Sequence, residues 1–474
     1  MTPILAALAL AFSQPAGAGS SAQGDFTSPR DKPAVMEARV EPRQDGRFDV
    51  SMTLRDDAPV WLFLRSNGPI SGAPSWREGS WEVLTPGIEL TRIGLHEVLM
   101  TSDGSPLPRE VRVAVKPYHG NLVADYQPAI RIGPRAIALF SDHFLMRPAA
   151  DAATVRGLGA DWTVLPDYDA GHPLARFSGE DWLVDGAPAR DIAVTEAEYV
   201  LHGTVTPGGN EAIVTYIDPT LPDWLGARLS DQIPDVLDLY AGRWGPHADG
   251  TPELLVEWAG PTPGTVSLGG SVIGSQLVMR LEGQALLAEN GGAGREVATL
   301  IAHEAAHFWL GNLVAYGRPG DAWTSEGGAD LAALRALGSI DPGTAERRNA
   351  FATRVAWRQC ASFLGDGGLS SAPERGQQKA FYSCGFLLSL AAEEVARRRG
   401  TDFFGFWSAL IEANREDGEV DGEDWFDGVS TMGASPATLA SMRTIVQDGG
   451  GEAALVDLFE AAGLPLPRFG EARR

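Results

Sequence analysis

The sequence predicts a multidomain α+β protein in which an N-terminal β-sandwich-type domain precedes a mainly helical domain. From about residue 23 to residue 201, short apolar or alternating runs are separated by turn residues, which is typical of a β-rich domain. After about residue 205 the apolar residues recur at helical spacing instead. The predicted ranges are 1–22 for a signal peptide, 23–205 for the β-rich domain, 206–390 for the core of the helical domain and 391–474 for its C-terminal helices.

The first residues resemble an export signal. Met1–Phe12 is an apolar run of signal-peptide length, and Ala16-Gly17-Ala18 fits a small-residue cleavage site. The run lacks a preceding Lys or Arg, which departs from the usual pattern, and it is too short to span a bilayer as a mature helix. The sequence therefore predicts a secreted or periplasmic protein with no stable insertion in a membrane.

Three segments of the N-terminal region are the clearest strand candidates. Residues 47–54 alternate between apolar and polar side chains, and residues 60–64 and 111–115 are mainly apolar. The pairs Asp45-Gly46 and Asp103-Gly104 supply turn signals between such runs. Short strands separated by turns favour two packed sheets, so we expect a β-sandwich here.

The second half of the chain contains helical patterns around one extended segment. Residues 230–240 have helical periodicity and residues 253–258 are extended and apolar. Residues 295–310 lack Gly and Pro and are rich in Ala and Leu, which favours a helix. Amphipathic helices are predicted at 387–399, 402–414 and 453–462.

The charge of the chain excludes some partners. Among 474 residues, 38 Lys and Arg oppose 62 Asp and Glu, a formal net charge of 38 − 62 = −24 at pH 7. Nucleic acids and anionic lipid surfaces both require basic patches, so neither is an expected partner. The two cysteines, Cys360 and Cys384, leave two alternatives open, which are a disulfide in an oxidising compartment or two buried thiols.

One motif in the predicted helix at 295–310 carries the chemistry. His303 and His307 are four residues apart, so on a helix they project from one face and both imidazoles can reach one cation. Glu304 stands beside them, where it can contact a water at the metal without being a ligand. The alternative interpretation is a pair of surface histidines on an amphipathic helix.

The next segment supplies a third ligand. Eighteen residues separate His307 from Glu326, which opens a second helical run at 323–337. Three protein ligands leave a fourth position for water, which is the open geometry of a catalytic zinc site. This donor set favours one Zn²⁺, although manganese or cobalt also accept it. Asp330 lies one turn after Glu326 and is either an acceptor for the free N–H of a ligand histidine or a solvated or capping carboxylate.

The residues from His303 to Val314 resemble the H-E-x-x-H-x-W-x-G-N-x-V signature of the aminopeptidase N family of gluzincin metallopeptidases. The spacing to Glu326, within Trp-x-x-Glu-Gly, is similar to that family as well. The resemblance covers about residues 231–390. It implies a thermolysin-like, mainly helical catalytic domain behind a β-domain, and hydrolysis of peptide bonds with Glu304 as general base.

The resemblance also implies a role for a tyrosine. The family carries Tyr-x-x-Gly some 60 residues after the zinc-binding glutamate, and here Tyr382 stands 56 residues after Glu326. By this resemblance Tyr382 would donate a hydrogen bond to the tetrahedral oxyanion, or else it is an ordinary packing residue. The family's usual Lys in this motif is replaced by Cys384.

One segment departs from the family. Members that trim N-termini carry Gly-x-Met-Glu-Asn before the zinc helix, and its Glu holds the free amine of the substrate. Here the corresponding residues are Gly269-Gly270-Ser-Val-Ile273, and Ile273 takes the place of that Glu. An apolar side chain cannot pair with an ammonium group. The segment can still form an edge strand that binds an extended peptide, so Gly269, Gly270 and Ile273 are candidate substrate-binding residues.

These observations predict a zinc metallopeptidase, aminopeptidase-like, that acts on a peptide or protein substrate. Two alternatives remain, which are a zinc-containing peptide-binding or assembly protein without catalysis and an endopeptidase or esterase variant. Intact Glu304 disfavours the pure binder, whereas Ile273 favours it. A calcium loop at 417–422 is disfavoured because Gly428 stands where the bidentate Glu belongs.

Overall fold

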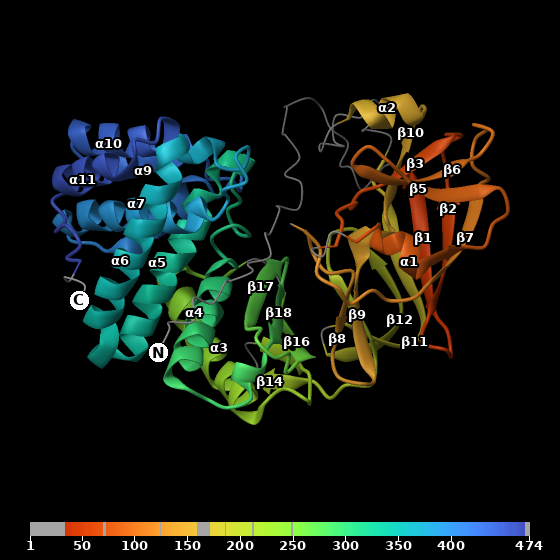
Figure 1. Cartoon of the computed structure of the whole chain (residues 1–474). Coiled ribbons are helices and arrows are strands. Elements are labelled where there is room, and N and C mark those ends of the chain that lie inside the picture. Colours follow the sequence, from red (N-terminus) through yellow and green to blue (C-terminus); the bar gives the residue numbers. More distant parts are fainter. Residues whose placement is uncertain are drawn as a thin grey trace. The chain divides into compact units, whose positions relative to one another are not determined.

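The computed structural model describes residues 34–69, 73–123, 125–158, 171–184, 186–210, 213–247 and 250–469 (Figure 1). The predicted signal peptide, residues 1–22, lies outside these residues. The chain forms two compact units. The first comprises residues 1–221 and 251–284, and the second comprises residues 222–250 and 285–474.

The first unit contains the predicted β-sandwich. One sheet has the strand order β4-β7-β2-β1-β11-β13-β9-β8 with β12 paired to β11, and the other has the order β10-β3-β6-β5. The strands are β1 (Met36–Pro42), β2 (Phe48–Leu54), β3 (Val60–Phe63), β4 (Trp81–Val83), β5 (Ile88–Ile93), β6 (His96–Thr101), β7 (Glu110–Val115), β8 (Ala129–Arg131), β9 (Ala136–Phe140), β10 (Met146–Ala149), β11 (Leu174–Val184), β12 (Ala187–Val194) and β13 (Tyr199–Gly203).

The alternation along β2 shows why these residues form a sandwich. Phe48, Val50, Met52 and Leu54 are buried, and the residues between them are only partly buried. The buried set shares one apolar core with residues of both sheets, such as Trp61 of β3. The strands predicted at 47–54, 60–64 and 111–115 are thereby confirmed, and so is the β-rich N-terminal domain.

A separate five-stranded sheet also belongs to the first unit. Its order is β14-β15-β16-β18-β17, with β15, β16 and β18 parallel and β17 antiparallel to β18. The strands are β14 (Gly208–Asn210), β15 (Ile213–Ile217), β16 (Glu253–Gly260), β17 (Ser267–Ile273) and β18 (Gln276–Glu282). The predicted range 206–390 placed these residues with the helices. They group with the β-rich unit because Tyr216, Leu255 and Val278 pack against Phe140 and Tyr199.

The second unit is helical, as predicted. Its helices are α3 (Asp223–Trp244), α4 (Gly291–Ala306), α5 (Trp323–Ile340), α6 (Ala345–Phe363), α7 (Ala380–Arg398), α8 (Phe403–Ala413), α9 (Gly422–Thr431), α10 (Pro436–Gln447) and α11 (Gly451–Ala462). The remaining short helices of the described chain are α1 (Trp76–Ser80), α2 (Ala152–Gly157), η2 (Ser141–Phe144), η4 (Gln284–Leu286), η5 (Pro319–Asp321), η6 (Pro342–Thr344), η7 (Leu364–Asp366) and η8 (Leu369–Ser371).

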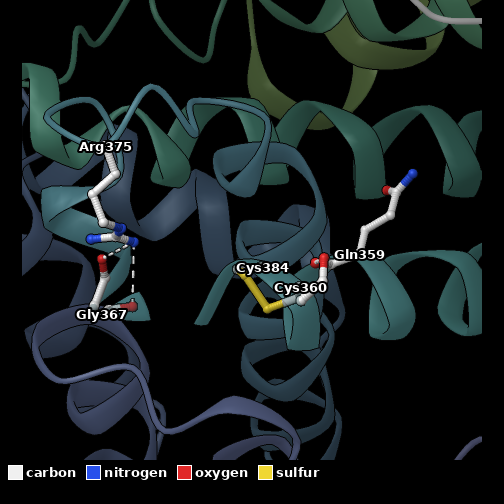
Figure 2. Close-up of a disulfide and its surroundings, with 7 residues drawn as sticks. Gln359, Cys360, Gly367, Arg375 and Cys384 are labelled. Carbon is white, nitrogen blue, oxygen red and sulfur yellow. Dashed lines mark hydrogen bonds between the residues drawn. A yellow bond between two sulfur atoms is a disulfide. The ribbon is translucent and has the colours of Figure 1, made fainter. Parts of the chain in front are cut away.

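In the second unit, helix α5 packs along α7, and α6 packs against α7 as well. Helix α5 approaches α7 at a pair of glycines, where a Cβ added to Gly327 would lie 2.0 Å from the carbonyl carbon of Gly385. Helix α6 is joined to α7 by the disulfide Cys360–Cys384, with the two Cα atoms 4.9 Å apart (Figure 2). Of the two alternatives for these cysteines, the structure therefore shows the disulfide.

A helix that crosses a lipid bilayer requires about 20 apolar residues. No helix within the described ranges is both long enough and apolar enough to cross a membrane.

Candidate metal centre

Helix α4 presents the first two candidate ligands. It begins after Asn290, whose side chain accepts hydrogen bonds from the backbone N–H groups of Gly292 and Ala293 and so caps the helix. It ends at Ala306, earlier than the predicted residue 310, because the last turn tightens and the N–H of His307 bonds to the carbonyl of Glu304. The prediction was therefore displaced by four residues at each end.

His307 nevertheless remains in place as a ligand. Its backbone keeps helical angles, φ −68° and ψ −14°, so its side chain still lies one turn beyond that of His303. Glu326 comes from the first turn of α5, and both histidines and this glutamate are at least 92% buried. In the described part of the chain, these three residues form the one group of three or more potential metal-binding side chains with converging ligand atoms.

The three ligand atoms lie at nearly equal separations. The two histidine Nε2 atoms are 3.1 Å apart, and each lies 3.4 Å from Glu326 Oε2. Zinc binds nitrogen and carboxylate oxygen at about 2.0–2.2 Å, so tetrahedral coordination separates its ligand atoms by about 3.3–3.6 Å. The two distances to Glu326 Oε2 fall within that range, and the distance between the histidine nitrogens is slightly shorter.

The hydrogen bonds of the histidines explain why these atoms require a cation. His303 Nδ1 lies 2.9 Å from Asp330 Oδ1, and His307 Nδ1 lies 2.8 Å from the carbonyl oxygen of Leu310. Both partners are acceptors, so in the neutral rings Nδ1 carries the proton and Nε2 carries a lone pair. Two lone pairs therefore face each other, and neither can donate to the other. Glu326 Oε2 faces them, buried and without a hydrogen bond. These residues fit a zinc ion.

The charge state of the carboxylates agrees with this arrangement. Although burial lowers the pKa values of His303 and His307, without a cation the carboxylates around them raise these values by more, so these rings take up protons. Although burial raises the pKa of Glu326, the positive charge of the rings holds that pKa far below its usual value, so this group is ionised at neutral pH, and a zinc ion would take the place of those protons. For Glu304 the effect of burial is the larger one, so its pKa is raised although the nearby histidines act to lower it. Glu304 is 3% exposed. A buried carboxylate with a raised pKa is suited to accept a proton near neutral pH.

Tyr382 completes the group from a third helix. It lies in the first turn of α7, and its ring stacks against that of His303 with centroids 5.8 Å apart. Burial, together with the carboxylates of Glu326, Glu304 and Asp330, raises the pKa of Tyr382 well above its usual value. The phenol therefore keeps its proton and can donate a hydrogen bond at neutral pH.

Part of the chain around the candidate ligands is similar to a known protein family. Residues 277–366 match the model of the peptidase family M1 domain, and this match includes all three candidate ligands. The matched segment is thus similar to the peptidase family M1 domain. The predicted resemblance to the aminopeptidase N family is confirmed at that level. Curated protein sequences give no significant match to the chain.

Solved structures show the same architecture around the M1 domain. Native yeast LTA4 hydrolase is similar with a TM-score of 0.51 and 14% sequence identity, over 94% of this chain and 73% of that chain. Yeast LTA4 hydrolase in complex with bestatin is similar with a TM-score of 0.50 and 14% identity, over 92% and 71% of the two chains. The likeness confirms the predicted order of a β-rich domain followed by a helical domain.

The candidate substrate-binding residues belong to the other compact unit. Gly269, Gly270 and Ile273 all lie on β17, the last strand of the five-stranded sheet, as expected for an edge strand. Ile273, however, is 5% exposed and packs in an apolar cluster that includes Tyr126 and Phe140. Its side chain belongs to the apolar core, and the binding of an extended peptide along β17 stays a prediction.

Two features of the centre carried no signal in the sequence. The acceptor for His307 is a backbone carbonyl, that of Leu310, and any residue supplies one. The approach of α5 to α7 depends on Gly327 and Gly385, which are far apart in the sequence. A glycine following Glu326 and a glycine in the Tyr-x-x-Gly motif were visible, but their mutual contact was not.

Proposed function

We propose that the protein is a zinc-dependent peptidase that hydrolyses peptide bonds with an activated water. The observation that carries the proposal is the convergence of two imidazole lone pairs and one buried carboxylate oxygen, with Glu304 and Tyr382 around them. The M1 domain supports the same chemistry. Zinc held by His303, His307 and Glu326 would supply polarisation of the scissile carbonyl and a more acidic water.

Glu304 is assigned as the general base. It adjoins His303 in the sequence and is buried beside the candidate ligands, and its raised pKa lies nearer to neutrality than that of a free carboxylate. It would take a proton from the attacking water and later pass that proton to the leaving amine. A protein that only binds peptides needs no such carboxylate, which favours catalysis over the binding alternative.

Tyr382 is assigned as the donor to the oxyanion. The phenol is protonated at neutral pH, and it is half-buried close to the carboxylates of Glu304 and Glu326. A fixed donor aimed at developing negative charge typically contributes about 10²–10³-fold to kcat. The ring stacking on His303 restrains the direction of the phenol.

Recognition of the substrate's free amine has no assigned residue. Ile273 stands where the resemblance would place an acidic side chain, and its side chain is buried among apolar residues. The proposal therefore covers aminopeptidase-like cleavage of peptides and endopeptidase cleavage, and leaves the choice to experiment.

The experiment compares two matched fluorogenic peptides, one with a free N-terminus and one acetylated, with the zinc-loaded protein. Glu304→Gln is the blank. Cleavage of the free peptide alone supports an aminopeptidase, and cleavage of the acetylated peptide supports an endopeptidase. Failure to cleave either peptide, with zinc bound, contradicts the proposal and favours a zinc-containing binding protein.

We also propose that the protein acts outside the reducing cytosol. The apolar run at Met1–Phe12 has the length of an export signal. The disulfide Cys360–Cys384 supports an oxidising compartment, where such bonds persist. Cell fractionation of the native host tests this, and recovery of the protein in the cytosol alone would contradict it.

A further inference from the structure

We propose that the disulfide Cys360–Cys384 is a positioning device for Tyr382, and that it holds the phenol at the metal centre from behind helix α7. The inference rests on the proposed function, in which Tyr382 donates to the oxyanion. Cys384 lies two residues after Tyr382 on the same helix, and its sulfur is bonded to α6 (Figure 2).

The two side chains leave α7 in nearly opposite directions. Each residue of an α-helix turns the chain by about 100°, so residues two apart are rotated by about 200°. Tyr382 therefore faces the metal-binding side, where it stacks on His303, and Cys384 faces α6. Both cysteines are fully buried. A displacement of the back of this helix is a displacement of the phenol as well.

The start of α7 is held by backbone hydrogen bonds from Ala380 and Phe381 and lacks a side-chain cap. Its N-cap, Lys379, makes no side-chain capping hydrogen bond, and the first turn contains no acidic residue that would favour the helix dipole. Tyr382 is the third residue of the helix, within the turn where helices fray. A covalent bond in the next turn is therefore well placed to keep this first turn in order.

The segment before α7 is organised around its own arginine. Arg375 donates hydrogen bonds to the carbonyls of Gly367 and Gly368 and to the hydroxyl of Ser371 (Figure 2). Arg375 Nε also donates a hydrogen bond of 3.0 Å to Gln377 Oε1. The arginine thus orders the loop internally, while the disulfide connects helix α7, which follows the loop, to α6.

On its other side, α7 contacts α5 through the backbone at a pair of glycines, and further along through the ion pair of Arg335 with Glu393. Gly385 lies against the carbonyl of Trp323 and against Gly327, so close that a Cβ on Gly385 would come within 2.3 Å of that carbonyl oxygen. Gly327 follows the ligand Glu326, and Gly385 follows Cys384. The glycine contact places no side chain between the two helices at the level of Tyr382, and the disulfide holds α7 from the opposite side. A displacement of about 1 Å in such a site can reduce the rate by about 100-fold.

The test is a cycle of variants at steady state. The double variant Cys360→Ala with Cys384→Ala should lower kcat about tenfold and leave KM and zinc content unchanged. The loss should be smaller than the loss of about 10²-fold expected for Tyr382→Phe, because the phenol is then misplaced and not removed. In the Tyr382→Phe background, removing the disulfide should have no further effect on kcat, because the group it positions is gone. If the two losses multiply, the proposal is overturned.

A matched control separates positioning from general stability. Glu393 lies further along α7, is 2% exposed and forms an ion pair with Arg335 of α5. Glu393→Gln should lower the melting temperature, as loss of the disulfide does, but leave kcat unchanged below the melting transition. A fall in kcat equal to that of the disulfide variant would mean that any loosening of α7 has the same result, and would contradict the specific role of the disulfide.

A measurement independent of activity uses 3-fluorotyrosine at position 382. Its ¹⁹F resonance should shift or broaden when the disulfide is removed and should stay unchanged in Glu393→Gln. An unchanged resonance in the disulfide variant overturns the inference even if no peptide is cleaved, whereas inactivity of the wild-type protein contradicts the proposed function alone. If the alanine pair does not fold, Cys360→Ala with Cys384→Val fills more of the buried volume and replaces it.

Discussion

Two buried histidine environments in this chain differ in how their nitrogen atoms are satisfied. His143, in the β-rich unit, places Nε2 2.9 Å from the carbonyl of Tyr126 and Nδ1 3.4 Å from Arg77 Nη2. One ring nitrogen donates a hydrogen bond and the other accepts one, so both nitrogens are satisfied while the ring is neutral. Burial and the charge of Arg77 lower the pKa of His143 well below its usual value, which agrees with that state.

The histidines of the metal centre are satisfied on one side alone. Nδ1 of His303 and of His307 each face an acceptor, and the two Nε2 atoms face each other and Glu326. The charges around His143 are also matched, since fully buried Arg77 pairs with Glu97 and Arg65 pairs with Asp125 and Asp142. Burial of charged groups therefore does not by itself identify a functional site. The candidate metal centre differs from the surroundings of His143 because, among the described residues, its two histidine Nε2 atoms lack hydrogen-bond donors.

The largest effect is expected at the metal centre. Glu304→Gln should reduce peptide hydrolysis by about 10³–10⁴-fold, because a general base contributes up to that much. Zinc content, measured by metal analysis of the purified protein, should stay the same since Glu304 is not a ligand. Glu296→Gln on the exposed side of α4 is the control and should remain active. An active Glu304→Gln protein would exclude the assigned base.

The opposite behaviour is expected in the β-rich unit. Arg77→Met leaves Glu97, buried at 1% exposure, without its fully buried cation. Ser75 and the more distant Arg92 then remain beside it, and breaking such a buried pair typically costs about 3–5 kcal/mol. Urea unfolding should show this loss, while the folded protein should keep its kcat. The double variant Arg77→Met with Glu97→Leu should recover much of the stability. Loss of activity in stable Arg77→Met protein would contradict a purely structural role.

The five-stranded sheet contains a further buried carboxylate, that of Glu257. Glu257 on β16 is 4% exposed and lies 3.3 Å from Arg280 of β18, and burial raises its pKa to about 7. Because the folded pKa exceeds the unfolded value of about 4.5, ionisation of Glu257 costs stability as the pH rises through 7. Glu257→Gln should match the wild type at pH 4 and be more stable by up to about 3 kcal/mol at pH 8.5.

Glu282 on β18 supplies a control of opposite sign. Although burial opposes the shift, hydrogen bonds from Thr262 and Arg280 lower the pKa of Glu282, so its contribution to stability is present above the unfolded pKa and is lost as the pH falls. Glu282→Gln should therefore be less stable than the wild type at pH 8.5. Equal pH profiles of unfolding for both variants would mean that neither shift exists.

The smallest effect is expected for the residue behind the metal centre. Asp330→Asn keeps an oxygen that can accept from His303 Nδ1 but removes the charge, and loss of such a partner typically lowers metal affinity by about 10–100-fold. Competition with a chelating dye measures this. Unfolding of the zinc-free protein should change little, because Asp330 is partly exposed. Unchanged zinc affinity would place Asp330 among surface carboxylates.

Local patterns predicted the parts of the site that lie within one or two turns of the chain. His303, Glu304 and His307 share a helical face by spacing alone, and Asp330 follows Glu326 by one turn. The limits of α4 were predicted less well. Asn290 caps a helix that begins with glycines, and the tightened turn at His307 ends it early, because capping and turn contacts outweigh intrinsic propensity.

The sequence by itself determined the set of candidate ligands, because side-chain type and helical spacing act over a few residues. It also determined the order of a β-rich part before a helical part. Tertiary structure decided that β14 to β18 group with the β-rich unit, that Ile273 is a core residue, and that Cys384 bonds to Cys360. Each of these depends on contacts between distant segments, and such contacts exist only once the whole chain has packed.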